Sequence, residues 1–329
     1  MGFKMGKMNT MQEPSNLGEL KGRVSDVVTD VTSDQRSRML DHKSFKFKHS
    51  LGHFPALSIP NVEKLTQRLL DEKRFNQVFC SMGDKAGYTD KEGASKVLAA
   101  LQSLDTAGAW LRLTRVDEIN EDFRDICETF YADLSRLMNR DIKSEVMKTF
   151  VTLFISSPGK VTPYHMDHTW NFLLQIDGRK TVYLFDENDP RVLKQEDREG
   201  WYMQQCTIEE NKSVPGIAYD LAPGEGAHHP VNAPHWVQNG PEVSVSLSFG
   251  LCLHSSNEDA RVHQMNYLLR KLGMNPTPPR KSKWRDSVKI GTVKLVSKRK
   301  PNSMEEVVFS GIKPLHRVHR VLKMARLAQ

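Results

Sequence analysis

The pattern of apolar and polar positions divides the chain into a helical first part and a strand-rich second part. Apolar residues recur at the spacing of one helical face in 120–138 and again in 61–70. Asn61 stands at the start of the earlier segment and is of a type that caps helices. The sequence therefore predicts helices in the first part, at residues 61–70, 90–104 and 120–138.

Short segments with strand patterns follow from residue 146 onward, after one alternating segment at 109–116. Residues 171–176 and 180–185 flank Asp177-Gly178, a dipeptide typical of hairpin turns, so we expect these two strands to pair. Several short strands separated by Pro- and Gly-containing turns favour a sandwich or jelly roll. The other strand candidates are residues 150–155 and 243–249.

The two ends of the chain differ from this middle. Residues 1–45 are polar and weakly periodic, and we interpret them as a flexible segment that holds at most a short helix or strand. Residues 256–272 have a helical pattern and are followed by a Pro-rich break and a basic tail. We therefore divide the chain into a flexible segment 1–45, a folded domain 46–255 and a helical, basic extension 256–329.

Charge is unevenly distributed along the 329 residues, whose net charge is +7. Residues 261–329 hold 17 Lys or Arg and three acidic residues, a net charge of +14 that leaves −7 for the rest. This asymmetry suggests an acidic partner such as nucleic acid, a phosphorylated substrate or an acidic protein surface. A merely solvated tail is the alternative. Residues 315–327 have an amphipathic, basic pattern that suits a partner, an anionic membrane surface or a homodimer.

Composition narrows the class of protein. No apolar run approaches the length needed to span a bilayer, and the N-terminus lacks the apolar stretch of a secretory signal. The four cysteines are widely spaced and form no CxxC pair, which argues against a zinc ribbon or a redox motif. These features fit a protein of the reducing cytoplasm.

One constellation carries chemistry. His165 and Asp167 are two positions apart, so on a strand they would share a face, and His235 follows Ala233-Pro234 further along. Two imidazoles and one carboxylate on one side of a metal leave the other positions open, which suits a non-haem Fe(II) oxygenase. The His-x-Asp pair alone is a weak signal, and its surroundings decide how it is interpreted.

The stretch from Thr162 to Phe185, together with segments 233–240 and 244–249, resembles the JmjC-like, or cupin-type, branch of Fe(II)/2-oxoglutarate dioxygenases. The resemblance covers about residues 150 to 252. It implies an α+β fold with a double-stranded β-helix (jelly-roll) core, preceded by N-terminal helices and followed by a C-terminal helical, basic extension.

The resemblance also implies roles for individual residues. His165, Asp167 and His235 match the iron ligands. Lys180 matches the lysine that pairs with the distal carboxylate of 2-oxoglutarate, a role that suits a lysine point charge in a half-buried pocket. Ser248 occupies a position where many relatives have Asn. The residues that would contact the cosubstrate are therefore Thr162, Asn171, Lys180 and Ser248.

The implied reaction consumes 2-oxoglutarate and O₂, yields succinate and CO₂, and hydroxylates or demethylates a substrate. The substrate is not identified by the sequence and could be a small molecule, a protein side chain or RNA. Tyr164 and His228 are candidates for the substrate pocket. Because strand neighbours alternate, only one of His228 and His229 can face the metal.

Two alternatives stay open at this stage. One is a catalytically silent cupin that binds a ligand or partner, in which Lys180 would be a surface charge. The other is a metal-dependent cupin that uses no 2-oxoglutarate. Such sites often carry additional ligands, so His228 or Glu225 beside the metal would favour it.

Overall fold

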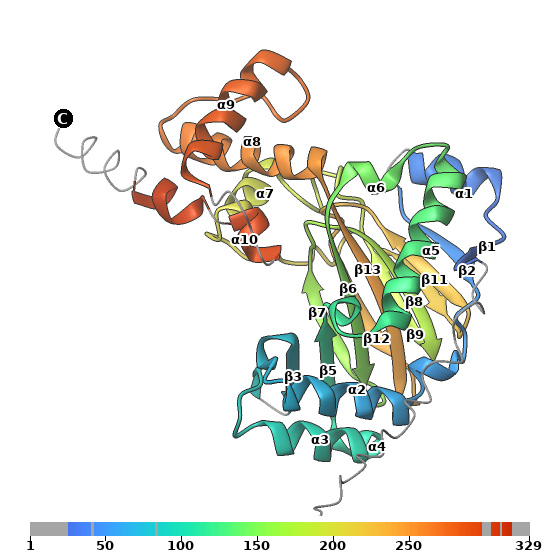
Figure 1. Cartoon of the computed structure of the whole chain (residues 1–329). Coiled ribbons are helices and arrows are strands. Elements are labelled where there is room, and N and C mark those ends of the chain that lie inside the picture. Colours follow the sequence, from blue (N-terminus) through green and yellow to red (C-terminus); the bar gives the residue numbers. More distant parts are fainter. Residues whose placement is uncertain (1–25, 41–42, 83–84, 298–303, 310, 318–329) are drawn as a thin grey trace, which may run out of the picture.

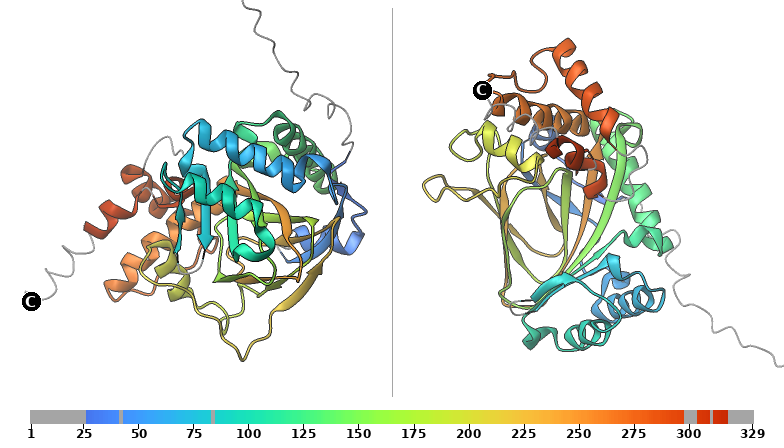
Figure 2. Two further views of the ribbon diagram at one scale, coloured as in Figure 1. Left: turned by 90° about the horizontal axis from the view of Figure 1, so that it is seen from below. Right: turned by 90° about the vertical axis from the view of Figure 1, so that its left-hand side faces the viewer.

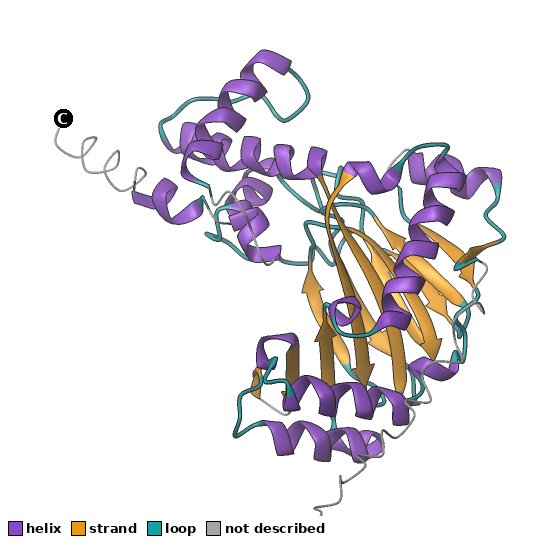
Figure 3. Ribbon diagram, viewed as in Figure 1, coloured by secondary structure: helices purple, strands orange, loops and turns teal. Residues whose placement is uncertain are grey.

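Two β-sheets stand at the centre of the molecule, with helices at both ends and along one side (Figures 1 and 3). This computed structural model describes residues 26–40, 43–82, 85–297, 304–309 and 311–317. Its helices are α1 Ser33–Leu40, α2 Ile59–Asp71, α3 Ala94–Gln102, α4 Leu104–Ala107, α5 Glu121–Met138, α6 Ile142–Glu145, α7 Gln195–Tyr202, α8 His254–Lys271, α9 Lys283–Val296 and α10 Met304–Phe309. Among the described residues, none of these helices has the length and apolar character that crossing a membrane requires.

The larger sheet has nine strands in the order β1-β2-β11-β8-β13-β6-β5-β3-β4, and every pairing in it is antiparallel. Its strands are β1 Val28–Thr29, β2 Phe45–His49, β3 Val78–Met82, β4 Lys85–Tyr88, β5 Ala109–Thr114, β6 Val146–Ser156, β8 Trp170–Asp177, β11 Glu225–His229 and β13 Ser244–Leu253.

The smaller sheet has four strands in the order β10-β9-β12-β7, again antiparallel. Its strands are β7 Val161–His165, β9 Lys180–Leu184, β10 Ile217–Leu221 and β12 His235–Asn239. Leu173 and Ala227 of the larger sheet pack with Val182 and Leu184 of the smaller one, so the two sheets enclose a common interior. The predicted α+β fold with a jelly-roll core is confirmed.

Helix α5 covers the outer face of the larger sheet (Figure 1). Its apolar stripe enters the main core, where the Phe130 ring stacks on Phe249 of β13 with centroids 4.2 Å apart. The helix begins after Asn120, whose side chain accepts hydrogen bonds from the backbone N–H groups of Asp122 and Phe123. It ends at Asn139, which adopts a left-handed conformation with φ +50°. The predicted helix 120–138 is confirmed.

The predicted cap of the earlier helix is wrong. Helix α2 begins at Ile59 after Ser58, with Pro60 in its first turn, where a missing N–H costs nothing. Asn61 therefore lies inside the helix, and its side-chain amide donates to the Pro55 carbonyl at 2.8 Å.

The predicted hairpin at Asp177-Gly178 is also wrong. The turn exists, with Gly178 at φ +67°, but β8 pairs with β11 and β13 while β9 pairs with β10 and β12. The turn therefore carries the chain from one sheet to the other. Both strands are buried, so each finds partners of its own within its sheet.

The segment boundary predicted at residue 45 is too late for the described residues. Val27 and Val28 are buried in the main core, and their backbone N–H groups donate to the buried carboxylate of Asp133 on α5. Strand β2 starts at Phe45 and pairs with β11. Residues 1–25, and most of the amphipathic segment predicted at 315–327, lie outside the described part of the chain.

Candidate metal centre

The three predicted ligands meet at one end of the interior between the sheets. One ligand atom from each of His165, Asp167 and His235 lies within 4.8 Å of the other two. His165 ends β7 and His235 begins β12, and the two residues are direct partners in the smaller sheet. Asp167 lies beyond the end of β7, in the loop to β8, and not on the strand itself. Asp167 therefore comes close to the two histidines through the loop, and not by sharing a strand face with His165 as the spacing predicted.

Both histidines are oriented in the same way. The Nδ1 atom of His165 lies 2.7 Å from the Pro163 carbonyl, and that of His235 lies 3.0 Å from the Ala233 carbonyl. A carbonyl only accepts, so each Nδ1 carries the proton and donates it. Each Nε2 is left with a free lone pair, the form in which a histidine binds a metal.

Asp167 is held as a carboxylate. The Asn171 amide donates to its Oδ2 atom at 2.7 Å, and the Thr169 hydroxyl in turn donates to the Asn171 amide oxygen at 2.6 Å. Burial opposes ionisation of Asp167, but the neighbouring His165 and His235 and the hydrogen bond from Asn171 outweigh it, so its pKa falls below the usual range. Asn171, predicted as a cosubstrate residue, thus also orients a metal ligand.

His235 is held neutral. Burial, together with the neighbouring His165, lowers its pKa to about 4. Its Nε2 atom lies 4.0 Å from Oδ2 of Asp167, and its ring centroid lies 4.2 Å from that of His165. Two imidazoles and one carboxylate form a donor set that fits a divalent iron ion, with the remaining positions open.

Lys180 lies on the inner face of the smaller sheet, four residues along β9 from Leu184, the partner of His235. Its side chain is 6% exposed and shares this face with Val182 and Leu184. Burial lowers its pKa to about 7, and among the described residues no neighbouring acid raises it again. A buried amine without a carboxylate is a place for an anionic ligand.

The remaining predicted cosubstrate residues also face the interior. Thr162 pairs with Val237 of β12, which packs in the inter-sheet core. A register shift between His235 and Val237 lets Thr162 and His165, three residues apart, share this face. Ser248 pairs with Leu173, so it too points between the sheets.

The two predicted substrate-pocket residues lie elsewhere. His228 is fully buried on the outer face of β11: its Nδ1 donates to the Asn171 carbonyl and its Nε2 accepts from the Trp170 indole, both at 2.9 Å. Tyr164 packs its ring edge-on against Phe185, in a cluster outside the smaller sheet. Neither side chain enters the interior in which the three predicted ligands meet.

His229, not His228, faces the metal ligands. Its ring lies against that of His235, with centroids 4.7 Å apart, and both of its nitrogens are buried without a hydrogen-bond partner. Asn239, which pairs with Lys180, likewise has a buried amide oxygen without a partner. The alternation of β11 predicted that one histidine faces inward, but only the register with β8 decides which.

Glu225 lies at the other end of β11 and makes its contacts there. Its carboxylate accepts from the Ala222 backbone N–H at 2.9 Å and pairs with Lys46 at 2.7 Å. With His228 also occupied elsewhere, neither additional ligand of the cupin without 2-oxoglutarate lies at the metal site. The additional imidazole that does face the ligands is that of His229.

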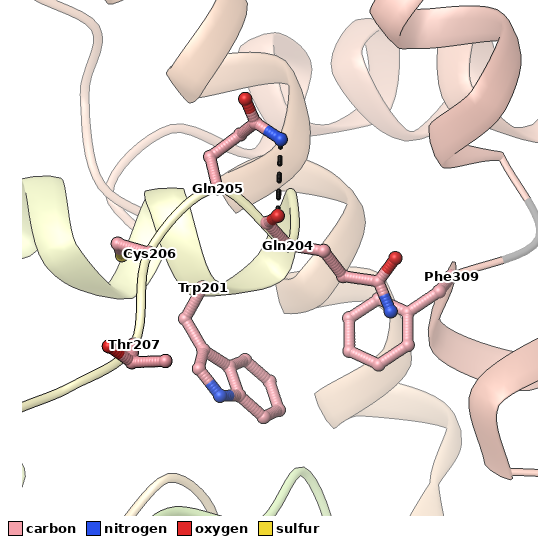
Figure 4. Close-up of a pocket in the computed structure, with 6 residues that line it drawn as sticks. All are labelled: Trp201, Gln204, Gln205, Cys206, Thr207 and Phe309. Carbon is pink, nitrogen blue, oxygen red and sulfur yellow. Dashed lines mark hydrogen bonds between the residues drawn. The ribbon is translucent and has the colours of Figure 1, made fainter.

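One surface pocket of about 630 Å³ lies between α7 and α10, away from the three ligands (Figure 4). It is lined by Trp201, Gln204, Gln205, Cys206, Thr207 and Phe309. None of these is a metal ligand, and the amide of Gln205 is used within the pocket wall, where it donates to the Gln204 carbonyl.

Comparison with known proteins places the chain in a family. A family model described as a cupin-like domain matches residues 10–299, which is most of the chain, so the chain belongs to this family of JmjC-like cupins. The family-level resemblance seen in the sequence motif is confirmed. A search of curated proteins found no match.

Several solved structures are similar to this chain. Escherichia coli YcfD shares 16% identity with a TM-score of 0.44, covering 85% of this chain and 70% of YcfD. A structure of YcfD, described as a ribosomal oxygenase in complex with cobalt and 2-oxoglutarate, also gives 16% and 0.44, covering 83% and 69%. A cupin superfamily protein from Desulfitobacterium hafniense shares 13% with a TM-score of 0.22, covering 32% and 68%.

Proposed function

We propose that this protein is an Fe(II)- and 2-oxoglutarate-dependent oxygenase that hydroxylates, or demethylates, a substrate not yet identified. The observation that carries the proposal is that one interior holds both a possible metal site and a buried amine. An open metal face of His165, Asp167 and His235 stands at one end, and the buried, uncompensated amine of Lys180 stands further along the same enclosed surface.

The donor set supports the choice of metal. Two neutral nitrogen ligands and one carboxylate occupy one side of the ion and leave positions for the cosubstrate and O₂. Iron, when bound, would supply the oxidative chemistry that couples decarboxylation of 2-oxoglutarate to oxidation of the substrate. The protein holds the ligand geometry through the Pro163 and Ala233 carbonyls and the Asn171 amide.

The interior supports the choice of cosubstrate. Four residues of strand separate Lys180 from the position paired with His235, which is about 13 Å along the sheet. The lysine side chain and a short dicarboxylate can together bridge this distance. One carboxylate would then lie at the metal and the other at the amine. Thr162 offers a hydroxyl on the same face. Burial strengthens the attraction between the ammonium and the distal carboxylate.

Succinate formation tests the proposal. Purified protein with Fe(II), O₂ and 2-oxoglutarate is expected to form succinate, measured by NMR, through slow turnover without substrate. His165→Ala should abolish the product by removing a ligand. Lys180→Met should raise the concentration of 2-oxoglutarate needed by at least about tenfold, because a charge-assisted contact is lost. Lys64→Met, at an exposed position of α2, is the matched control. Equal succinate from wild type and His165→Ala would reject the proposal.

A further inference from the structure

The larger sheet continues beyond the jelly-roll interior as strands β5, β3 and β4. On β5, Leu111 and Leu113 point into the main core, so Trp110 and Arg112 point to the opposite face. Arg112 is the direct partner of Phe154 on β6, and Phe154 packs against the inter-sheet core. The face that carries Arg112 is therefore continuous with the face that lines the interior.

Aromatic rings surround Arg112 on this face. Its guanidinium lies over the ring of Phe79 at 4.9 Å and near that of Tyr88 at 5.8 Å from the centroid. Trp110 packs edge-on against Phe79 and stacks on Phe154 with an interplanar angle of 19°. We call Phe79, Tyr88, Trp110, Arg112 and Phe154 the Arg112 platform. Tyr88 is 51% exposed, so the outer rim of the platform is open to solvent.

The guanidinium has more donors than partners. One terminal nitrogen donates to the Tyr88 hydroxyl at 3.2 Å, while Nε is buried and has no partner. Within the described residues, no carboxylate lies within ion-pair distance of Arg112. Buried guanidinium donors are normally satisfied, and their planar fork matches a carboxylate or a phosphate. The unpartnered donors of Arg112 therefore suit an anionic ligand.

The platform adjoins the interior that holds the triad. Phe154, the strand partner of Arg112, packs against the inter-sheet core. A molecule whose anionic group lies on Arg112 can extend its other end toward the open side of the metal.

We propose that the Arg112 platform binds the prime substrate, and that this substrate is a planar or aromatic molecule bearing a carboxylate or phosphate group. The anion would take the free guanidinium donors, and the ring would stack on the aromatic side chains. This inference rests on the proposed function, because it names the substrate class of the same metal site.

The test uses full-length protein loaded with Mn(II), with and without saturating 2-oxoglutarate. The probes are benzoate, phenyl phosphate and the neutral benzyl alcohol. Proton relaxation of each probe reports both its affinity and its approach to the metal. Benzoate or phenyl phosphate should bind more tightly than benzyl alcohol, with the same affinity when 2-oxoglutarate is present. The better of the two anions identifies the carboxylate or the phosphate as the natural group.

Variants connect the binding to the platform. Arg112→Met should weaken binding of the preferred anion by about tenfold or more, a larger loss than for Mn(II) or 2-oxoglutarate. Arg112→Lys keeps the charge but not the planar fork. Its affinity for the anion should therefore lie between those of wild type and Arg112→Met. Arg68→Met, at an exposed position of α2, is the control and should bind as wild type does. Thermal unfolding checks that each variant is folded.

Three results would overturn the inference: benzyl alcohol binding as tightly as the anions, Arg112→Met binding them as wild type does, or 2-oxoglutarate displacing them. The last would place the anions in the cosubstrate site. Failure of the proposed function is a separate result, namely absence of 2-oxoglutarate binding to wild type. The titrations without 2-oxoglutarate still decide whether Arg112 binds an aromatic anion.

Discussion

At the residue scale, Lys180 is the side chain whose surroundings most constrain the chemistry of the interior. It is a cation placed among Val182 and Leu184 with no acid to balance it. Such a residue weakens the unliganded fold, since burial of an unpaired charge is costly. An anionic ligand that pairs with the amine would offset this cost.

The titration of Lys180 predicts how affinity for 2-oxoglutarate depends on pH. Burial lowers its pKa to about 7, so above this pH the free protein must take up a proton to bind the dianion. Affinity should therefore be greatest below pH 7 and should fall as pH rises, by at most about tenfold per pH unit. Calorimetry between pH 6 and about pH 8.5 measures the slope.

Lys180→Arg supplies the control, because arginine stays charged across this range. If it binds at all, its affinity should change little with pH. A wild-type affinity that is flat, or that increases with pH, would contradict the assignment of Lys180 as the partner of the carboxylate.

Gly250 predicts how the metal ligand Asp167 is supported. A Cβ at Gly250 would lie 2.9 Å from the Asn171 amide oxygen and 3.2 Å from the Thr169 hydroxyl, so Gly250→Ala should displace the amide that holds Asp167. Metal affinity is expected to fall roughly 10- to 100-fold, as for other losses of outer support. Competition against a metal-binding dye measures it. Gly87→Ala is the control, because a Cβ there meets nothing within 4 Å; equal losses in both variants would refute the argument.

The sequence predicted the three residues that the structure brings together, because a histidine, a carboxylate and a distant histidine form a recognisable chemical set. The sequence did not predict which face of the sheet a given side chain occupies. His228 and His229 are neighbours of the same type, and a shift of register by one residue exchanges their faces. Only the pairing of Phe172 with His228 and of Asn171 with His229 places His229 inside.

At the scale of elements, the cap of α5 can be distinguished from the false cap of α2. Asn120→Ala should lower the free energy of unfolding by about 1 kcal/mol, because two backbone N–H groups lose their acceptor. Asn61→Ala removes only an exposed hydrogen bond to the Pro55 carbonyl, which precedes α2, and should cost less. Urea denaturation measures both. An equal or larger loss at Asn61 would contradict the helix start at Ile59.

The elements that the sequence predicted best are those whose pattern is local. Helix α5 and strand β5 show their burial directly in their periodicity. The connection at Asp177-Gly178 was misread because a turn signal states that the chain reverses, not which strands then pair. In this fold the turn changes sheets, and the pairings of β8 and β9 depend on strands far away in the sequence.

At the scale of the whole molecule, the C-terminal extension is attached to the jelly roll by buried contacts. Tyr202 of α7 stacks on His263 of α8, and Arg270 of α8 donates to the fully buried carboxylate of Glu199 at 2.9 and 3.1 Å. The helices from α7 to α9 gather at the same end of the molecule (Figure 2). The sequence-based boundary at residue 255 therefore does not mark the end of the packed body.

Arg270 tests this attachment. Arg270→Met leaves the carboxylate of Glu199 buried without its cation and should lower the free energy of unfolding by about 3 kcal/mol. Arg191→Met breaks an ion pair whose arginine is 71% exposed and should cost much less, because solvent screens the pair. Thermal and urea unfolding compare the two. Similar, small losses would show that the extension contributes little to the stability of the core.

Several whole-molecule predictions stay predictions. The acidic partner, the homodimer and the cytoplasmic location rest on the charge and pattern of the sequence. Within the described part of the extension, α9 exposes Trp284, Val288 and Leu295 on one face, beside Lys283 and Arg285. This surface agrees with a partner of acidic character without identifying one.

The central claim is that one interior holds both the metal and 2-oxoglutarate. Calorimetric titration of 2-oxoglutarate into anaerobic, Fe(II)-loaded protein tests it most directly. We predict saturable binding at one site per chain that disappears without metal and in His165→Ala, and is weakened in Lys180→Met. No binding to the iron-loaded wild type, or equal binding with and without metal, would contradict the account.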